Sequence, residues 1–294
     1  MFFARSQRSL IIFVLPGCAL LTLLIAWPVL QSAVAALSLS SGTEEGATQF
    51  AGLTHFKTLV TQSSFWSSLS LAAVFTLTTT ALELFIASTV ALFLYFQRKL
   101  PRIVEVLLIL PMFVLPVVSG LTFRYIYDPN DGPLSSLFNA FGYEPMSPLA
   151  DSFWAFWAIV LQDIWRMWPF LFLIIYAGLK ALPKSAHEAA KMDGANTREL
   201  IRYIIFPALR PTLAVAMGLK VMESLKVFTE VYVMTGGGPG DSTSLLSLFV
   251  VKQAFHFFQI GPASAASILL LILGMSLAWG ITRLQNRASL AGGN

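Results

Sequence analysis

Charged side chains that could line a polar path recur along one apolar segment, residues 212–234. Lys220, Glu223, Lys226 and Glu230 follow one another at intervals of three, three and four residues. On a continuous helix these positions fall within an arc of about 120° on one face, and their alternating signs let neighbours pair. Charges inside a span normally face a cavity or a partner. The face is therefore either an ion ladder between helices or the wall of a polar path, and the sequence leaves both open.

A second polar group lies in the apolar segment of residues 153–179. Its polar and aromatic members are Gln162, Asp163, Trp165, Arg166 and Trp168. Sugar sites combine aromatic faces with hydrogen bonds from carboxylates and guanidinium groups, so this cluster is a candidate part of the substrate path. Glu83 stands alone in another apolar segment. Pairing with a second subunit and a role in the path are both open for it.

No motif for catalysis or metal binding accompanies these residues. The stretch GGGPGDST over residues 236–243 lacks the spacing and the Gly-Lys-Ser/Thr ending of a phosphate loop and is expected to form an external turn. Cys18 is the one cysteine, and His55, His187 and His256 are far apart in the sequence. We therefore expect no enzymatic activity, no catalytic residues, no metal and no bound cofactor in this chain.

The composition is that of a protein that uses lipid as part of its solvent. Charged residues are 12% of the 294 and apolar residues 56%, with a mean hydropathy of +0.73. Six segments have the roughly 20 apolar residues that a membrane helix needs; they cover about residues 10–37, 69–96, 103–126, 153–179, 212–234 and 263–281. The first is too long for the core of a signal peptide, so a retained anchor is expected. The sequence thus predicts an all-α integral membrane protein with six transmembrane helices.

Prolines are expected to bend two of these helices. Pro111 and Pro116 should interrupt the third and Pro169 should bend the fourth, because proline removes a backbone donor and crowds the preceding turn. Such bends face protein or a water-filled path rather than lipid. Tolerated packing kinks remain the alternative.

The basic residues predict the orientation of the chain. Of the 19 lysines and arginines, 13 fall at the two ends, after the second span, or between the fourth and fifth spans. The positive-inside rule then places both termini and residues 184–211 in the cytoplasm. The charge is therefore topological and is not a nucleic-acid footprint. We expect an N-terminal tail, first span and external loop over residues 1–68, a membrane core with five spans over 69–285, and a cytoplasmic tail over 286–294.

The most charged stretch, EAAKMDGANTRELIRYIIFPALRP, begins at Glu188 between the fourth and fifth spans. Ser185, three residues earlier, is placed to form a capping box with Glu188 at the start of a helix over residues 185–192. Asp193 and Gly194 predict a sharp turn after it, since glycine accepts the left-handed conformation.

A second short helix is expected from about residue 196 to Pro207, leading into the fifth span. Small side chains keep the surface of the segment open to close approach; they are Ala186, Ala189, Ala190 and Ala195. Ordinary loops are shorter and irregular. A stiff helix–turn–helix at the membrane face therefore favours docking of a partner.

The segment resembles the EAA loop of membrane subunits in binding-protein-dependent ABC importers, whose pattern is E-A-A, three residues, G, nine residues and I-x-L-P. The matching residues are Glu188, Ala189, Ala190, Gly194, Ile204, Phe206 and Pro207, with Phe206 where leucine is usual. The Asp193–Ala195 triplet followed by Pro211 is similar to the carbohydrate-uptake branch, which includes maltose and glycerol-3-phosphate permease subunits. Residues 50–60, 232–255 and 258–267 also resemble segments of sugar permeases, so the likeness covers most of the chain.

The resemblance implies a type I ABC importer transmembrane domain whose cytoplasmic coupling helix sits in a cleft of an ATPase. It implies docking through Glu188, Ala189, Ala190, Asp193, Gly194, Ala195 and Pro207. It also implies a second homologous permease as heterodimer partner, two ATPase subunits that use ATP and Mg²⁺, an external substrate-binding protein, and a bacterial inner membrane.

The cargo implied is a sugar, a polyol or a glycerol-phosphate-like or acidic sugar. A different solute class remains open within the importer family. An ion-coupled secondary transporter that uses Glu83, Asp163 and the charges of the fifth span is the alternative outside the family. That alternative leaves the EAA segment unexplained.

Overall fold

The computed structural model describes residues 2–39, 49–97, 101–144 and 146–291. Among the basic residues counted after the second span, Arg98 and Lys99 lie outside these ranges, as do residues 292–294 of the predicted tail. The chain forms two compact units. One contains residues 1–65 and 250–271, and the other contains residues 66–249 and 272–294.

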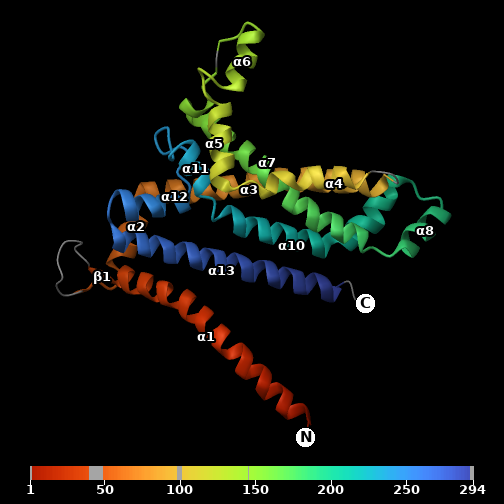
Figure 1. The fold of residues 1–294 in the computed structure, drawn as a ribbon, viewed down its shortest axis with the longest axis horizontal. Coiled ribbons are helices and arrows are strands. Elements are labelled where there is room, and N and C mark those ends of the chain that lie inside the picture. The colour runs from red at the N-terminus through yellow and green to blue at the C-terminus, as the bar shows by residue number, and fades with distance from the viewer. Residues whose placement is uncertain (1, 40–48, 98–100, 145, 292–294) are drawn as a thin grey trace. The chain divides into compact units, whose positions relative to one another are not determined.

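The smaller unit contains the first helix and a short strand pair. Its elements are α1 (Phe2–Leu37), β1 (Ser38–Leu39), β2 (Gln49–Phe50), α2 (Thr54–Thr61), η4 (Lys252–His256) and the start of α13 (Ile260–Ala291) (Figure 1). The strands pair antiparallel, a small addition to the predicted all-α fold. The Nε2 atom of His55 on α2 lies 3.0 Å from the carbonyl oxygen of Ser38. A Cβ at Gly261 would overlap the His55 ring, so the glycine permits this close approach.

The larger unit contains the remaining elements in chain order. They are α3 (Ser63–Phe96), α4 (Arg102–Ile109), η1 (Leu110–Phe113), α5 (Pro116–Ile126), α6 (Pro133–Ala140), η2 (Pro148–Ala150), α7 (Ser152–Lys180), α8 (Lys184–Met192), α9 (Thr197–Glu199), η3 (Leu200–Ile205), α10 (Phe206–Ser224), α11 (Thr229–Met234) and α12 (Leu246–Val251). Helices α3 and α13 each begin in the smaller unit and end in the larger one, and α12 crosses the boundary between Phe249 and Val250.

Five helices in the described ranges are long and apolar enough to cross a membrane, and a bent pair makes a sixth span. The five cover Val14–Leu37, Ser63–Phe96, Ser152–Lys180, Thr197–Ser224 and Ile260–Ile281. The bent pair joins residues 103–113 to residues 116–126 at an angle of 91°. The break falls at Pro111 and Pro116, as predicted from the missing backbone donors. Pro169, by contrast, lies inside α7 without interrupting it.

The predicted fifth span, residues 212–234, is wrong at both ends. One continuous helical stretch begins at Thr197, passes Pro207 and ends at Ser224. Proline cannot donate to the carbonyl four residues earlier and crowds it. The helix accommodates this in the π-helical turn η3, where the N–H of Phe206 donates to the carbonyl of Ile201, five residues back.

The core of the larger unit joins α3, α7 and residues 184–211, which contain the predicted coupling helix and are called the coupling segment below. On α3, Ala87, Ala91 and Leu94 are buried at helical spacing, and on α7 Leu171, Ile175 and Leu179 repeat every four residues. The small alanines let the larger α7 side chains pack closely. Further members of the same cluster are Phe172, Ala190, Leu200, Ile205, Leu209 and Ala216. The helix that follows the coupling segment is thus anchored on the two long spans.

Candidate functional site

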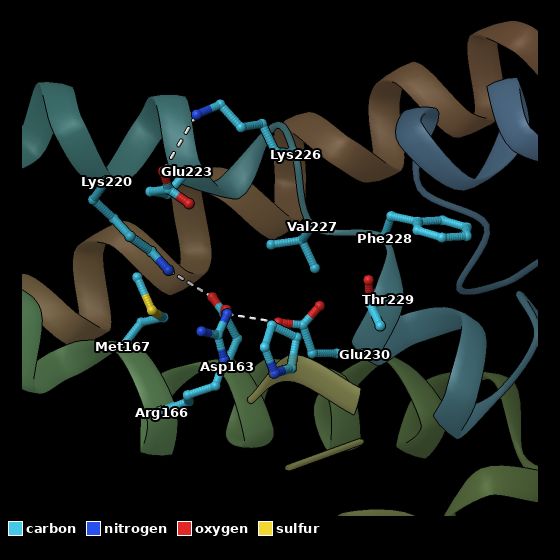
Figure 2. A pocket seen from close by; sticks show the side chains of 11 residues that line it. Asp163, Arg166, Met167, Lys220, Glu223, Lys226, Val227, Phe228, Thr229 and Glu230 are labelled. Carbon is cyan, nitrogen blue, oxygen red and sulfur yellow. Dashed lines mark hydrogen bonds and ion pairs between the residues drawn. The ribbon is translucent and has the colours of Figure 1, made fainter. Parts of the chain in front are cut away.

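A cavity of about 170 Å³ opens where the helix of α10 stops and the chain turns into α11. Residues 225–228 form the non-helical link between these two elements. The lining residues come from α5, α7, α10, the link and α11; they are Pro116, Asp163, Arg166, Met167, Lys220, Glu223, Lys226, Val227, Phe228, Thr229 and Glu230 (Figure 2). Charged side chains therefore dominate the wall.

Lys220 is buried between two carboxylates from different helices. Its Nζ lies 2.6 Å from Asp163 Oδ2 on α7 and 2.8 Å from Glu83 Oε1 on α3. The three side chains are between 0% and 1% exposed. A buried ammonium is tolerated only when it is paired and hydrogen-bonded. Lys220 therefore ties α10 to both α3 and α7.

Two further ion pairs involve the cavity wall. Arg166 Nη2 donates to Glu230 Oε1 at 2.6 Å, joining α7 to α11 in a largely buried pair. Lys226 Nζ lies 3.3 Å from Glu223 Oε1, and these side chains are 66% and 48% exposed. The first pair is strong because it is desolvated and charge-assisted, whereas the second is screened by solvent.

Two polar atoms on the wall have no hydrogen-bond partner in the described part of the chain. They are Asp163 Oδ1, on a side chain that is 1% exposed, and Arg166 Nε. One is an acceptor and the other a donor. Each atom has less than 1 Å² of accessible surface, so a partner can reach it only if these side chains move.

The charges of the predicted fifth span do not share one helix. Lys220 and Glu223 lie on α10, Lys226 lies in the link, and Glu230 lies on α11. The predicted arc on a continuous helix is therefore wrong, although all four side chains line the cavity. The cross-helix pairs support the ion-ladder interpretation, and the cavity supports the polar-path interpretation.

Glu83 also differs from its prediction. It is neither alone nor left for a second subunit, because it pairs with Lys220 of the same chain. The sequence offered no signal for this contact, since the rotation of α3 against α10 is set by packing of the whole core.

The aromatic part of the predicted substrate cluster is not at the cavity. Gln162 is buried and its Nε2 donates to Ser119 Oγ on α5 at 2.9 Å. Trp165 packs its ring against Phe123, with centroids 5.5 Å apart. Trp168 packs against the core residue Phe172. Gln162 and Trp165 are thus separated from the cavity lining, and Met167, Val227, Phe228 and Thr229 are lining residues that the charge-based search missed.

The coupling segment folds as a helix, a glycine turn and a second helix. Helix α8 ends at Met192, and the N–H of Ala195 donates to the carbonyl of Ala190 at 3.0 Å. Gly194 adopts a φ of +80°. This six-to-one bond across a left-handed glycine is a Schellman motif, which confirms the predicted turn.

The cap of the following helix is a capping box. The side chain of Asn196 accepts from the N–H of Glu199, whose carboxylate in turn accepts from the N–H of Asn196. The predicted capping role of Ser185 is wrong, because α8 begins at Lys184 and Ser185 lies in its first turn. A start at residue 196 is confirmed, but an end at Pro207 is not.

The candidate docking residues divide into an exposed group and a buried one. The exposed members are Glu188, Ala189, Asp193, Gly194 and Pro207. Ala195 is partly buried, and Ala190 is buried in the core cluster of its own subunit. A direct contact with an ATPase is therefore open to the exposed group, whereas Ala190 belongs to a core cluster that also contains residues of α3, α7 and η3.

The glycine-rich stretch after α11 is a compact turn. Gly236, Gly237 and Gly240 have positive φ angles, and the hydroxyls of Thr235 and Thr243 lie 2.7 Å apart across it. Glycine is needed there because side chains are strained at such angles. The predicted glycine-rich turn is confirmed.

Comparison with known proteins identifies the relatives of this chain. It is 33% identical over 230 residues to the trehalose/maltose transport system permease protein MalF of Thermococcus litoralis, covering 77% of each chain. It is 30% identical to the sulfoquinovosyl glycerol transport system permease protein SmoG of Agrobacterium fabrum, over 90% of this chain and 86% of the relative. A chain of the bacterial alginate ABC transporter, crystallised with its alginate pentasaccharide-bound periplasmic protein, has the same fold, with a TM-score of 0.82, 17% identity and 97% coverage of both chains.

The structural likeness agrees with the predicted membrane fold. Residues 84–290, which include the charged cavity and the coupling segment, match the family described as binding-protein-dependent transport system inner membrane component. That match extends over more than half of the chain. The protein belongs to this family of membrane permease subunits.

Proposed function

We propose that this chain is one permease subunit of an ATP-driven sugar importer and forms half of its translocation path. The cargo class is supported by the relatives, whose names specify trehalose and maltose or sulfoquinovosyl glycerol. The observation that carries the proposal is the coupling segment. It has the spacing of an EAA loop, and it is folded as an exposed helix and turn joined directly to the helix that ends at the charged cavity.

The proposed mechanism passes movement along one rigid element. The helix from Thr197 to Ser224 has 28 residues, about 42 Å at 1.5 Å per residue. It begins beside the docking turn and contains Lys220 near its other end. Closure of the ATPase on Glu188 and its exposed neighbours would therefore shift the ion pairs that hold α10 against α3 and α7. That gives a two-state scheme in which the nucleotide biases the docked segment.

The other subunits complete the proposal. A second, homologous permease forms the other half of the path, and two ATPase subunits bind ATP and Mg²⁺, while this chain binds no cofactor. An external binding protein delivers the sugar. The chain lies in a bacterial inner membrane with both termini and the coupling segment in the cytoplasm, as the distribution of basic residues favours.

Uptake by the reconstituted complex tests the proposal. Proteoliposomes containing both permeases, the ATPases and the binding protein should take up sugar only with ATP, and substitution of the ATPase catalytic carboxylate should abolish uptake. Omitting the binding protein is the control for specific delivery. Uptake that persists with an inactive ATPase, driven by a pH or ion gradient, would contradict the proposal and favour a secondary transporter.

A further inference from the structure

We propose that the charged cavity selects an uncharged sugar or polyol over a phosphorylated, sulfonated or carboxylated one. This inference rests on the proposed function and adds the charge class of the cargo. The relatives do not decide it, because trehalose and maltose are neutral whereas sulfoquinovosyl glycerol contains a sulfonate. The ion pairs of this chain do decide it.

Every cation on the cavity wall already has a carboxylate partner. Lys220 is held by Glu83 and Asp163, Arg166 by Glu230, and Lys226 by Glu223; the pair distances are 2.8, 2.6, 2.6 and 3.3 Å. Three cations and three carboxylates line the cavity, and Glu83 behind Lys220 is a fourth carboxylate. Among the described residues of this chain, the charge at the cavity is therefore neutral to negative, and an anionic cargo meets no cation in excess there.

Taking Lys220 or Arg166 from its partner would be costly, because both cations are held in largely buried pairs. A phosphate or sulfonate that bound Arg166 would leave Glu230 without its counter-charge, and one that bound Lys220 would leave two buried carboxylates unpaired. An uncompensated buried charge is strongly destabilising. An anion at either buried pair is therefore opposed twice, by repulsion from the carboxylates and by the broken pair. The exposed Lys226–Glu223 pair adds little to this, because solvent screens it.

The paired side chains can still bind hydroxyl groups. A carboxylate has about four acceptor sites and a guanidinium about five N–H donors, so one ion pair uses only part of the capacity of Asp163 and Arg166, which line the cavity (Figure 2). A hydroxyl both donates and accepts. Two hydroxyls of one sugar can therefore donate to a carboxylate of the wall and accept from Arg166 while every ion pair stays intact. A fully ionised phosphate or sulfonate offers acceptors only and would be repelled by the Asp163 carboxylate.

The volume of the cavity is consistent with hydrogen bonds to a few hydroxyl groups of one sugar. A cavity of about 170 Å³ holds roughly five or six water molecules at ~30 Å³ each. That is room for hydroxyls on the edge of one sugar unit. Exchange of these waters for hydroxyls preserves the hydrogen bonds without a change in charge.

Transport of matched substrate pairs tests the inference on the unmodified complex. Proteoliposomes with the binding protein are offered a panel of neutral sugars and polyols, each beside its phosphate ester, uronic acid or sulfonate. We expect ATP-dependent uptake of a neutral member at least tenfold faster than of its anionic counterpart. Equal or faster uptake of an anionic member overturns the inference while leaving the importer function intact. No ATP-dependent uptake of any sugar or polyol overturns the proposed function, and the inference with it.

A Glu230→Gln variant separates the permease from the selectivity of the binding protein. The change frees Arg166 from its ion pair at nearly constant side-chain size. Vesicles are loaded with the anionic analogue, and the ATP-dependent uptake of the neutral sugar is measured. The quantity compared is the rate of this uptake with the internal anion divided by the rate without it. We expect a ratio near one in the wild type, a ratio at least tenfold lower in Glu230→Gln, and the wild-type ratio in Glu230→Asp, which keeps the charge. A wild-type ratio as low as that of Glu230→Gln, or an unchanged ratio in Glu230→Gln, contradicts the inference.

Discussion

Lys220 shows how a single residue can depend on two distant parts of the chain. Its ammonium is fully buried and bridges Glu83 on α3 and Asp163 on α7. Desolvation of each ion costs several kcal/mol, and only close pairing offsets it. The three side chains therefore behave as a unit, in which loss of one partner leaves a charge that the surrounding core cannot solvate.

Replacement of Lys220 should destabilise the protein far more than replacement of an exposed lysine. We expect Lys220→Met to lower the free energy of unfolding by about 3–5 kcal/mol, the usual effect of breaking a buried ion pair. The matched control is Lys226→Met, which removes a 66% exposed partner and should change stability by less than about 1 kcal/mol. Denaturation midpoints of the purified complex in detergent provide the measurement.

The stability that Lys220→Met loses should also depend on Glu83 and Asp163, the two carboxylates that pair with Lys220. In a triple variant with Glu83→Gln, Asp163→Asn and Lys220→Met, no buried charge remains unpaired. This variant should recover part of the stability that Lys220→Met loses, because a neutral cluster avoids desolvation. Equal midpoints for Lys220→Met and Lys226→Met would show that Lys220 is not held as the structure has it.

Among the elements, α8 has two faces with different partners. Ala190 is buried in the core with residues of α3 and α7, whereas Ala189 beside it is exposed. A Schellman turn at Gly194 and a capping box at Asn196 fix the angle between α8 and the next helix. Local chemistry thus sets the shape of the docking surface, and one alanine attaches it to the spans.

A bulkier side chain should act differently on the two faces of α8. Ala190→Leu should overpack the core and destabilise the subunit by about 1–3 kcal/mol. Position 189 is exposed, so in Ala189→Leu the subunit should stay folded. The larger side chain should lower the affinity for the ATPase, because it stands on the predicted docking surface. Copurification of the ATPase, together with the denaturation midpoint of the complex, separates the two effects. An Ala189→Leu protein that keeps full ATPase affinity would remove Ala189 from the docking surface.

The turn at Gly194 can be tested against a glycine of the same conformation. Gly194 and Gly142 have φ angles of +80° and +78°, and a Cβ at either would meet no atom within 4 Å. Valine at either site therefore introduces similar backbone strain, on the order of 1–3 kcal/mol, without a clash. We expect Gly194→Val to lower uptake per ATP hydrolysed at least tenfold and Gly142→Val to leave this ratio unchanged. Equal ratios for the two variants would contradict a coupling role for the turn.

At the scale of the whole molecule, the sequence predicts what hydropathy controls and misses what packing controls. The spans that begin near residues 69, 153 and 263 follow from length and composition, and the break at Pro111 and Pro116 follows from proline chemistry. The end of α10 at Ser224 does not, since residues 225–228 contain neither proline nor glycine.

Close packing explains that missed break. Gly120 on α5 lies directly against Glu230 on α11, so close that a Cβ there would be 3.3 Å from the Glu230 Cα. This contact holds α11 on α5, a placement that local sequence does not encode. The charged residues of the site were identifiable because ions are rare in spans. Their partners were not, because helix rotations depend on the assembled core.

Labelling of single cysteines should establish the orientation of the whole chain. Cys18 is the one cysteine, so its replacement by serine gives a background without thiols. Asn139 on α6 lies between the bent third span and α7 in the chain, whereas Glu188 follows α7, on the side that the basic residues predict to be cytoplasmic; both side chains are exposed. In right-side-out vesicles, a membrane-impermeant maleimide should label Asn139→Cys at least tenfold faster than Glu188→Cys, and permeabilisation should equalise them. The reason is that 13 of the 19 basic residues are predicted to face the cytoplasm on the side of Glu188.

Faster labelling of Glu188→Cys from outside would place the coupling segment where no ATPase could reach it, and the proposed transfer of energy through Glu188–Pro207 would fail.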